Sequence, residues 1–181
     1  MFGQVHECWD IFETERTKVR EIMVSDVPAL FTLYGKPGAA DYVEPLYDYD
    51  EEVAYTEEYI NKIYAFYGYG MWVVTDKKTE QLIGRVGFED RTVAEVGRIL
   101  EFGYMIDPDY QHQGIGTEVC RRALQYAYET LDEPEVTCLI EIPNEASKRF
   151  ISRFGFRYIR LVENNGKTHE LWRGLRDEKV F

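Results

Sequence analysis

The residues best suited to chemistry by type and spacing run from Met105 to Thr117, with the sequence M-I-D-P-D-Y-Q-H-Q-G-I-G-T. This segment contains the end of a strand, a short loop and two glycines that precede a helix. Glycine permits a tight turn and a close approach of a ligand to the backbone. The amides of a first helical turn have no partner inside the helix, and the helix dipole adds positive potential there. Such a loop suits an anion, in particular a pyrophosphate.

Two familiar phosphate-binding motifs do not fit this loop. A Walker A loop requires Gly-Lys-Ser/Thr, but Thr117 and Glu118 follow Gly116. A dinucleotide fingerprint requires a third glycine where this sequence has Val119. A glycine pair before a helix also occurs in ordinary strand-to-helix turns, so the loop alone leaves a purely structural role open.

A second motif downstream makes the pattern more specific. Asn144-x-x-Ser147 opens another predicted helix, which ends in F-G-F at 154–156. The ordered pair Q-x-x-G-x-G and N-x-x-S…G-F resembles the GNAT superfamily of N-acetyltransferases. Taken together, the two motifs indicate the superfamily, but they say little about the substrate.

Segments in the first half of the chain resemble one branch of this superfamily in particular. T-E-R-T-K-V-R-E at 14–21, G-M-W-V-V at 70–74 and L-I-G-R-V-G-F at 82–88 resemble the branch that acetylates the N-terminal alanine or serine of ribosomal proteins, with its small-molecule relatives. The resemblance implies one N-acetyltransferase domain over 14–181, preceded by an N-terminal extension at 1–13.

The resemblance also implies the fold and the elements that position the loop. The fold is the acyl-CoA N-acyltransferase type, an α+β (mixed α/β) plan with a central, twisted, mostly antiparallel sheet of about seven strands flanked by about four helices. Hydrophobic periodicity and turn residues predict strands at 18–24, 71–76, 81–90, 99–107, 136–142, 156–162 and 169–175, and helices at 27–35, 51–66, 114–131 and 144–154. Asp50 is the predicted cap of the second helix, residues 91–98 a connection, and Asn165-Gly166 a hairpin turn.

By the same resemblance, acetyl-CoA binds as a co-substrate. The strand before the glycine loop separates from its parallel neighbour, and the pantetheine arm pairs with the exposed backbone, as an extended amide chain can. The cofactor-binding positions carried over by match are Tyr104, Met105, Ile106, His112, Gln113, Gly114, Ile115, Gly116, Thr117 and Asn144.

The catalytic residues follow from what an amine needs. A free amine has a pKa near about 10, so it must lose a proton before it attacks a thioester. Glu101, on the splayed strand, is the first candidate base and Glu141 the second. Many members carry a tyrosine acid seven residues after the asparagine, but here the residue is Ile151, so Ser147, a water or no acid at all stays open. A solvated strand position for Glu101 and a first-turn hydroxyl for Ser147 are the structural alternatives.

The composition limits the partners. The 181 residues include 21 Lys+Arg and 33 Asp+Glu, a formal net charge of −12, which argues against nucleic acid and anionic membrane surfaces. No signal-peptide pattern and no apolar run of about 18 residues is present. Three cysteines without a C-x-x-C pair favour a reducing compartment, so we expect a cytoplasmic protein. The three histidines are far apart in sequence, and no metal site is expected.

The segment 41–58 combines acids with tyrosines and contains no Lys or Arg. Its acids are Asp41, Glu44, Asp48, Asp50, Glu51, Glu52, Glu57 and Glu58. A solvated helix face is one interpretation; the other is a wall that attracts a cationic amine acceptor by charge and cation–π contact. Family relatives are often dimers, so a homodimer is a further expectation. The competing functions are a non-catalytic acyl-CoA-binding or regulatory module and an interaction domain without the cofactor.

Overall fold

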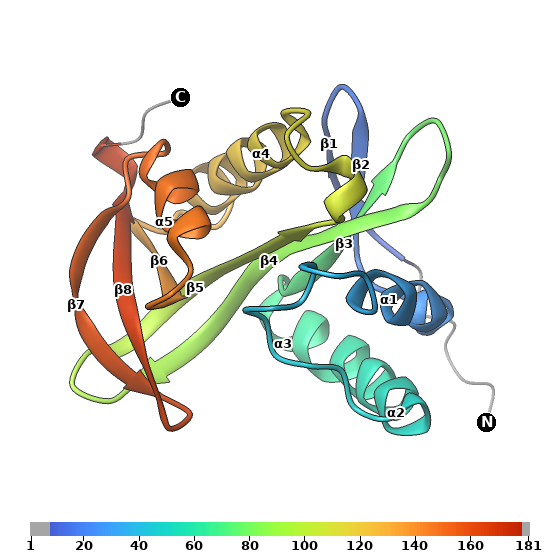
Figure 1. The fold of residues 1–181 in the computed structure, drawn as a ribbon, viewed down its shortest axis with the longest axis horizontal. Helices are drawn as coiled ribbons and strands as arrows, with labels where there is room; N and C mark the ends of the chain where they lie inside the picture. Colours follow the sequence, from blue (N-terminus) through green and yellow to red (C-terminus); the bar gives the residue numbers. More distant parts are fainter. Residues whose placement is uncertain (1–7, 179–181) are drawn as a thin grey trace. The chain divides into compact units, whose positions relative to one another are not determined.

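A sheet of eight strands, in the order β1-β2-β3-β4-β5-β6-β8-β7, organises this computed structural model, which describes residues 8–178 (Figure 1). β5 and β6 pair in parallel, and the pairs β1–β2, β2–β3, β3–β4, β6–β8 and β7–β8 are antiparallel. The strands are β1 (Asp10–Glu13), β2 (Thr17–Arg20), β3 (Met71–Asp76), β4 (Leu82–Val93), β5 (Gly97–Ile106), β6 (Glu135–Glu141), β7 (Arg157–Asn164) and β8 (Lys167–Leu175). The predicted mostly antiparallel α+β fold is confirmed, with β1 as an additional strand.

The helices are α1 (Val27–Tyr34), α2 (Tyr49–Tyr59), α3 (Ala65–Tyr67), α4 (Ile115–Glu129) and α5 (Glu145–Ser152). A π-helical segment, Ile60–Tyr64, joins α2 to α3, so the single predicted helix over 51–66 is nearly continuous. It starts earlier than predicted, because Asp48 and not Asp50 occupies the cap position. Within the described residues, no helix is long and apolar enough to cross a membrane.

Two compact units make up the chain, and each is considered by itself. The first comprises the described residues up to Gly87 together with Tyr104–Val119, and the second comprises Phe88–Gly103 together with the described residues from Cys120 onward. The glycine loop therefore belongs to the first unit. Glu101, Asn144 and Ser147 belong to the second.

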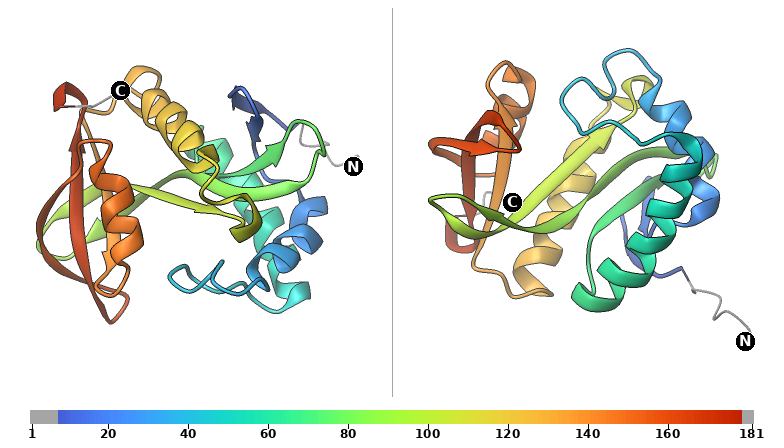
Figure 2. Two further views of the ribbon diagram at one scale, coloured as in Figure 1. Left: turned by 45° about the horizontal axis from the view of Figure 1, so that its top comes forward. Right: turned by 90° about the horizontal axis from the view of Figure 1, so that it is seen from below.

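In the first unit, α1 and α2 lie next to each other (Figure 2). The buried core includes Leu30 and Leu33 of α1 and the consecutive β3 residues 72–74. β2 ends at Arg20 and not at residue 24 as predicted. The reason is Asp26, whose carboxylate binds the Arg20 guanidinium at 2.7 Å and accepts a hydrogen bond from the Met23 amide, which turns the chain into a 3-10 helix.

In the second unit, β4 and β5 extend into the predicted connection at 91–98 and leave residues 94–96 as the turn, so the connection is shorter than predicted. Val93 and Ile99 are buried with Val162 and Leu171 in a hydrophobic cluster that holds both strand ends in place. The final hairpin is confirmed. Asn165 and Gly166 have φ angles of 49° and 73°, the left-handed conformation that a two-residue hairpin turn requires.

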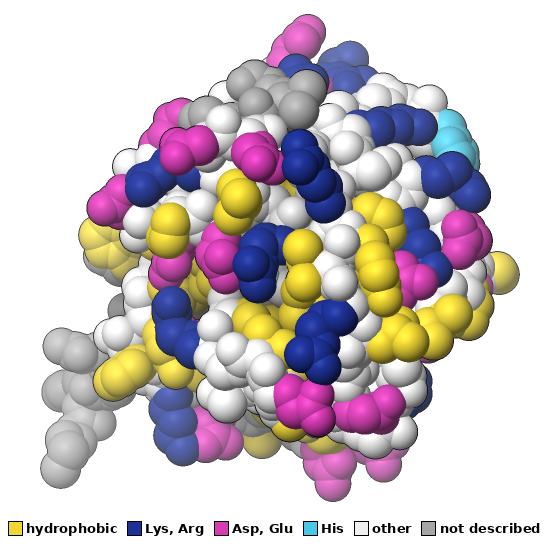
Figure 3. All heavy atoms as spheres, turned by 90° about the vertical axis from the view of Figure 1, so that its left-hand side faces the viewer, with side chains coloured by type: hydrophobic (Ala, Val, Ile, Leu, Met, Phe, Trp, Pro, Cys, Tyr) yellow, Lys and Arg dark blue, Asp and Glu magenta, His cyan; other side chains and the backbone are white. Residues whose placement is uncertain are grey.

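Strand β7 forms one edge of the sheet and exposes several large hydrophobic side chains. Tyr158, Ile159 and Leu161 are each about half exposed. On the face viewed in Figure 3, hydrophobic side chains are interspersed with basic and acidic ones and form no single continuous patch. The expected homodimer therefore stays a prediction.

Candidate functional site

The loop that precedes α4 is held by hydrogen bonds at the end of β5. The Asp107 carboxylate accepts the Asp109 amide at 3.0 Å, and the Gln111 side-chain amide donates to the Ile106 carbonyl at 2.8 Å. The Lys36 ammonium, just after α1, binds the carboxylates of Asp107 and Asp109 at 2.7 and 2.6 Å. Asp107 is buried, so this ammonium supplies the counter-charge that a buried carboxylate needs.

The glycine loop itself has the backbone of an anion site. His112 and Gly114 have φ angles of 59° and 82°, and residues 111–114 are exposed. The Glu118 amide donates to the Gly114 carbonyl at 3.0 Å as the first bond of α4, so the amides of Ile115, Gly116 and Thr117 precede the helical ladder. Left-handed residues next to a helix start turn successive amides toward a common point, which favours an anion.

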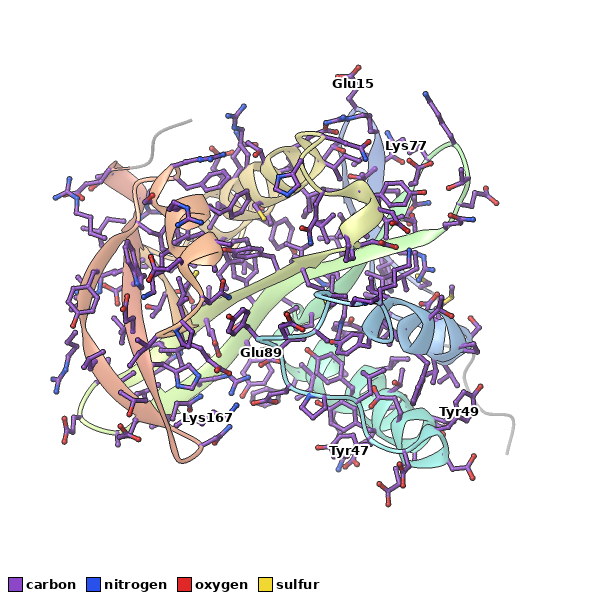
Figure 4. The ribbon with its side chains drawn as sticks, in the orientation of Figure 1. Glu15, Tyr47, Tyr49, Lys77, Glu89 and Lys167 are labelled. Carbon is purple, nitrogen blue, oxygen red and sulfur yellow. The ribbon has the colours of Figure 1, made fainter. Side chains whose placement is uncertain are left out.

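The turn between β1 and β2 clamps this loop. The Arg16 guanidinium donates to the Gln113 carbonyl at 2.9 Å and to the Glu118 carboxylate at 2.9 Å, and the Arg16 amide binds the same carboxylate at 3.0 Å. Glu15 points away from the molecule at the tip of the turn (Figure 4). Arg16 therefore holds the loop at the Gln113 carbonyl and holds the first turn of α4 at Glu118.

Glu118 would oppose an anion at the start of α4 if it were not neutralised. Burial acts to raise the pKa of its carboxyl, but hydrogen bonds from Thr14 and Arg16 outweigh burial and hold this pKa below its ordinary value of 4.5. Glu118 therefore stays ionised and stabilises the fold above pH 4.5, and that contribution is lost as the pH falls through the lowered pKa. The ion pair with Arg16 leaves little net charge beside the amides.

Glu101, the predicted base, lies in β5 opposite Thr137 of β6, in the single aligned pair of that parallel ladder. Its carboxylate forms an ion pair with Arg91, which also donates to Glu89 at 2.7 Å. The Glu101 side chain is 17% exposed. The carboxylate is therefore held in place by Arg91, and its role as the base stays a prediction.

Asn144 and Ser147 meet at the start of α5. The Asn144 side-chain oxygen accepts the Ser147 amide at 3.0 Å, an N-cap worth about 1 kcal/mol. Both residues therefore have a structural role at this position, and their contacts with a ligand stay predictions. Ile151, where many relatives have a tyrosine, is fully buried. The second candidate base, Glu141, accepts a hydrogen bond from Lys167 at 3.2 Å.

The acid- and tyrosine-rich segment is only partly a solvated face. Glu52 is buried and accepts the Tyr47 amide at 3.0 Å, so it orders the start of α2. Tyr47 and Tyr49 lie at the beginning of that helix (Figure 4) and are about half exposed. The Tyr47 ring lies 5.2 Å from that of Tyr55. Exposed rings beside carboxylates are the surroundings that a cation prefers.

The buried cysteines Cys120 and Cys138 offer no nucleophile. Burial raises the pKa of the Cys120 and Cys138 thiols, so neither is a thiolate at neutral pH. Across residues 8–178, no group of three or more His, Cys, Asp or Glu side chains could hold a metal ion.

Solved structures show which class of protein has this fold. The chain superposes on the ribosomal-protein-S5-alanine acetyltransferase of Vibrio fischeri with a TM-score of 0.72 and 19% identity, covering 94% of this chain and 98% of that one. It also superposes on RimL, a ribosomal L7/L12 α-N-protein acetyltransferase, with a TM-score of 0.75 and 16% identity, covering 94% and 96%. The architecture is that of the acetyltransferases.

The family follows from the sequence comparison. The family model described as an acetyltransferase (GNAT) domain matches residues 16–157, and the chain belongs to this family. It is similar to an uncharacterized N-acetyltransferase of Bacillus subtilis, YoaA, with 26% identity over 149 residues, covering 81% of this chain and 82% of the relative. The predicted resemblance to GNAT acetyltransferases is thereby confirmed.

Sequence reasoning missed the residues that support the site. Arg16, Lys36 and Arg91 bind the loop carbonyl or the site carboxylates, and none was singled out. The sequence carries a signal for Arg16 alone, because the T-E-R segment resembles the family. Nothing in the sequence connects Lys36 with Asp107.

Proposed function

We propose that the protein transfers the acetyl group of acetyl-CoA to a primary amine by direct attack in a ternary complex. The observation that carries this proposal is the amide-lined loop at 112–117 in a chain of the GNAT family. The amine nitrogen forms a bond to the thioester carbonyl carbon, the carbon–sulfur bond breaks, and the products are the N-acetylated amine and CoA. Residues 14–181 are proposed to act as one domain.

The residues present suit acetyl-CoA. The amides from His112 to Thr117 would bind its pyrophosphate. Backbone groups of Tyr104, Met105 and Ile106 would pair with the pantetheine arm, and because the Ile106 carbonyl already accepts Gln111, the amides carry that role at this end. A preorganised amide near Met105 would stabilise the developing oxyanion. Asn144 is proposed to reach the pantetheine arm from α5.

The direct test is thiol release. Purified protein is incubated with acetyl-CoA and a panel of peptides, polyamines, aminoglycosides and amino acids, and free thiol is measured against a blank without amine. Release with at least one amine supports the proposal. Tight CoA binding without release would favour the alternative, a non-catalytic acyl-CoA-binding module, and absence of binding would leave an interaction domain.

The acceptor is proposed to be an amine drawn in by the acid- and tyrosine-rich segment. The exposed rings of Tyr47, Tyr49 and Tyr55 and the neighbouring carboxylates support a cationic acceptor. Spermidine and ribosomal-protein acetyltransferases are both among structures with this fold, so either a small amine or a protein N-terminus fits it.

Arg16→Ala should raise the KM for acetyl-CoA about three- to tenfold, the loss of about 1 kcal/mol of binding, with kcat retained. The reason is that the glycine loop loses the guanidinium that binds the Gln113 carbonyl and Glu118. Steady-state rates at varied acetyl-CoA give the value. Lys18→Ala, which breaks an ion pair with Asp10 in the same hairpin, is the matched control and should leave this KM unchanged. Equal effects of both changes would contradict the clamp.

Glu101→Gln should lower kcat by about 10²-fold or more, most strongly at low pH, where the amine is hardest to deprotonate. The pH profile of kcat is the measurement. Glu89→Gln removes the other carboxylate bound to Arg91 and controls for a loosened Arg91. A flat pH response, or equal losses for the two variants, would remove Glu101 as the base.

A further inference from the structure

The guanidinium of Arg85, in β4, forms no ion pair with a carboxylate of any described residue. Arg85 lies opposite Val73 of β3 and is half-buried. Its Nη1 donates to the Tyr34 hydroxyl at 3.2 Å, and this is the one hydrogen bond of its side chain to any described residue. The Nε atom is buried without a hydrogen-bond partner. A buried guanidinium is costly unless it is paired, so its open donors require an explanation.

Other arginines in the described part of the chain show what is missing. Buried Nε atoms also occur in Arg91 and Arg173, but these lie against the carboxylates of Glu101 and Glu135. Arg20 is bound at two points by Asp26, with both distances 2.7 Å. Arg85 has only the Tyr34 hydroxyl at this place in the fold.

The tyrosines around Arg85 do not supply a counter-charge. Burial raises the pKa of the Tyr64 hydroxyl well above its ordinary value, so this group stays neutral, and it donates to the Met71 carbonyl at 2.7 Å. The Tyr59 hydroxyl accepts the Met71 amide at 2.8 Å. Both hydroxyls are therefore committed to the backbone at the start of β3.

The open donors share one edge of the guanidinium. With Nη1 held by Tyr34, the remaining groups are Nε and Nη2, which lie side by side and match the two oxygens of a carboxylate. Tyr34, at the end of α1, fixes the plane of the group. Arginine is suited to planar, two-point recognition of this kind.

The position of Arg85 connects it with the proposed reaction centre. At the preceding residue, a Cβ on Gly84 would come 2.4 Å from the Met105 carbonyl oxygen and 2.9 Å from the Ile106 side chain. β4 therefore runs against the backbone that is proposed to receive the acetyl group. Because neighbouring strand residues are about 3.3 Å apart, the backbone of Arg85 lies close to that of Met105 and Ile106.

We propose that Arg85 binds a carboxylate of the acceptor, so that the substrate is an amine that also carries a carboxylate. This inference rests on the proposed acetyl transfer and specifies its substrate class. Two kinds of acceptor could supply this carboxylate. It belongs either to a free amino acid or to an acidic side chain close to the N-terminus of a peptide.

The experiment uses amine pairs that differ only in the carboxylate. L-lysine is compared with cadaverine, L-methionine with L-methioninamide, and the peptide amide Ala-Asp-Gly-NH2 with Ala-Asn-Gly-NH2. In the wild type, kcat/KM for the carboxylate member of at least one pair should exceed that of its partner by about tenfold or more. Preference in the first two pairs indicates an amino acid, and preference in the peptide pair indicates a protein N-terminus.

Variants of Arg85 test whether this residue causes the preference for amines that carry a carboxylate. Arg85→Gln should remove it, Arg85→Lys should retain part of it, and Arg121→Gln, which changes an exposed arginine of α4, should leave it intact. The KM for acetyl-CoA should stay unchanged in all three. Equal kcat/KM within every pair for the wild type, or a preference that survives Arg85→Gln, overturns the proposal, and the wild-type result decides even if a variant does not fold.

Binding separates this inference from the proposed function. If no amine releases thiol, calorimetry with the CoA-saturated protein measures the carboxylate members directly. Binding by the wild type that is lost in Arg85→Gln then supports the carboxylate site although acetyl transfer has failed. Absence of binding to all carboxylate members overturns the site as well.

Discussion

Gly114→Val should raise the KM for acetyl-CoA by about tenfold or more, because it changes the shape of the proposed pyrophosphate loop. Gly114 has a φ of 82°, which a β-branched residue adopts only with strain of about 1–2 kcal/mol. A Cβ there would also lie 3.5 Å from Arg16 Nη2, so the branches of valine would press on the clamp. Steady-state kinetics at varied acetyl-CoA give the KM, and kcat should be largely retained.

The control for Gly114→Val is Gly97→Val. Gly97 has a φ of 94° and open space around its Cβ direction, so it shares the backbone strain but lies at the start of β5, directly after the β4–β5 turn. It should lower stability and leave the KM for acetyl-CoA unchanged. Unchanged KM in Gly114→Val, with the protein folded, would contradict a role for the loop in cofactor binding.

Gly87→Val should destabilise the fold on the order of 3–5 kcal/mol, or prevent folding altogether. Gly87 lies opposite Met71 in the β3–β4 ladder, and a Cβ there would come 2.0 Å from the Gly70 carbonyl oxygen and 2.8 Å from Met71 Cα. Both are backbone atoms, so the strands must separate or shift register. Urea denaturation followed by circular dichroism measures the loss.

Gly38→Val provides the comparison for Gly87→Val. Gly38 has a φ of 80° but nothing within 4 Å of its Cβ direction, so only backbone strain of about 1–2 kcal/mol is expected. If Gly87→Val lowered the free energy of unfolding no more than Gly38→Val does, β3 and β4 would be able to shift at this point without a large cost.

Local signals explain what the sequence could predict. The glycine loop, the start of α5 at Asn144 and the Asn165-Gly166 turn depend on residues within a few positions of one another, so their types alone indicate the structure. The bounds predicted for β4 and β5 were too short because the contacts that extend these strands join residues further apart in the sequence. Arg91 is a polar residue inside a strand, and there it binds the carboxylates of Glu89 and of Glu101, the latter ten residues further along the chain.

The support of the site also depends on distant residues. Arg16 and Glu118 are 102 positions apart, and Lys36 and Asp107 are 71 apart. A motif search finds the amides that would bind a ligand but not the charges that hold those amides in place. The same holds for Arg85, whose significance lies in a missing partner that only the surrounding structure shows.

The buried isoleucine at position 151 has a consequence for the alkaline side of catalysis. A tyrosine acid would make the rate fall again as its hydroxyl ionises, and a two-sided pH profile would result. Ile151 has no proton to give, and neither a serine hydroxyl nor water titrates in that range. In the proposed acetyl transfer, turnover should therefore rise to a plateau and stay there in alkaline solution.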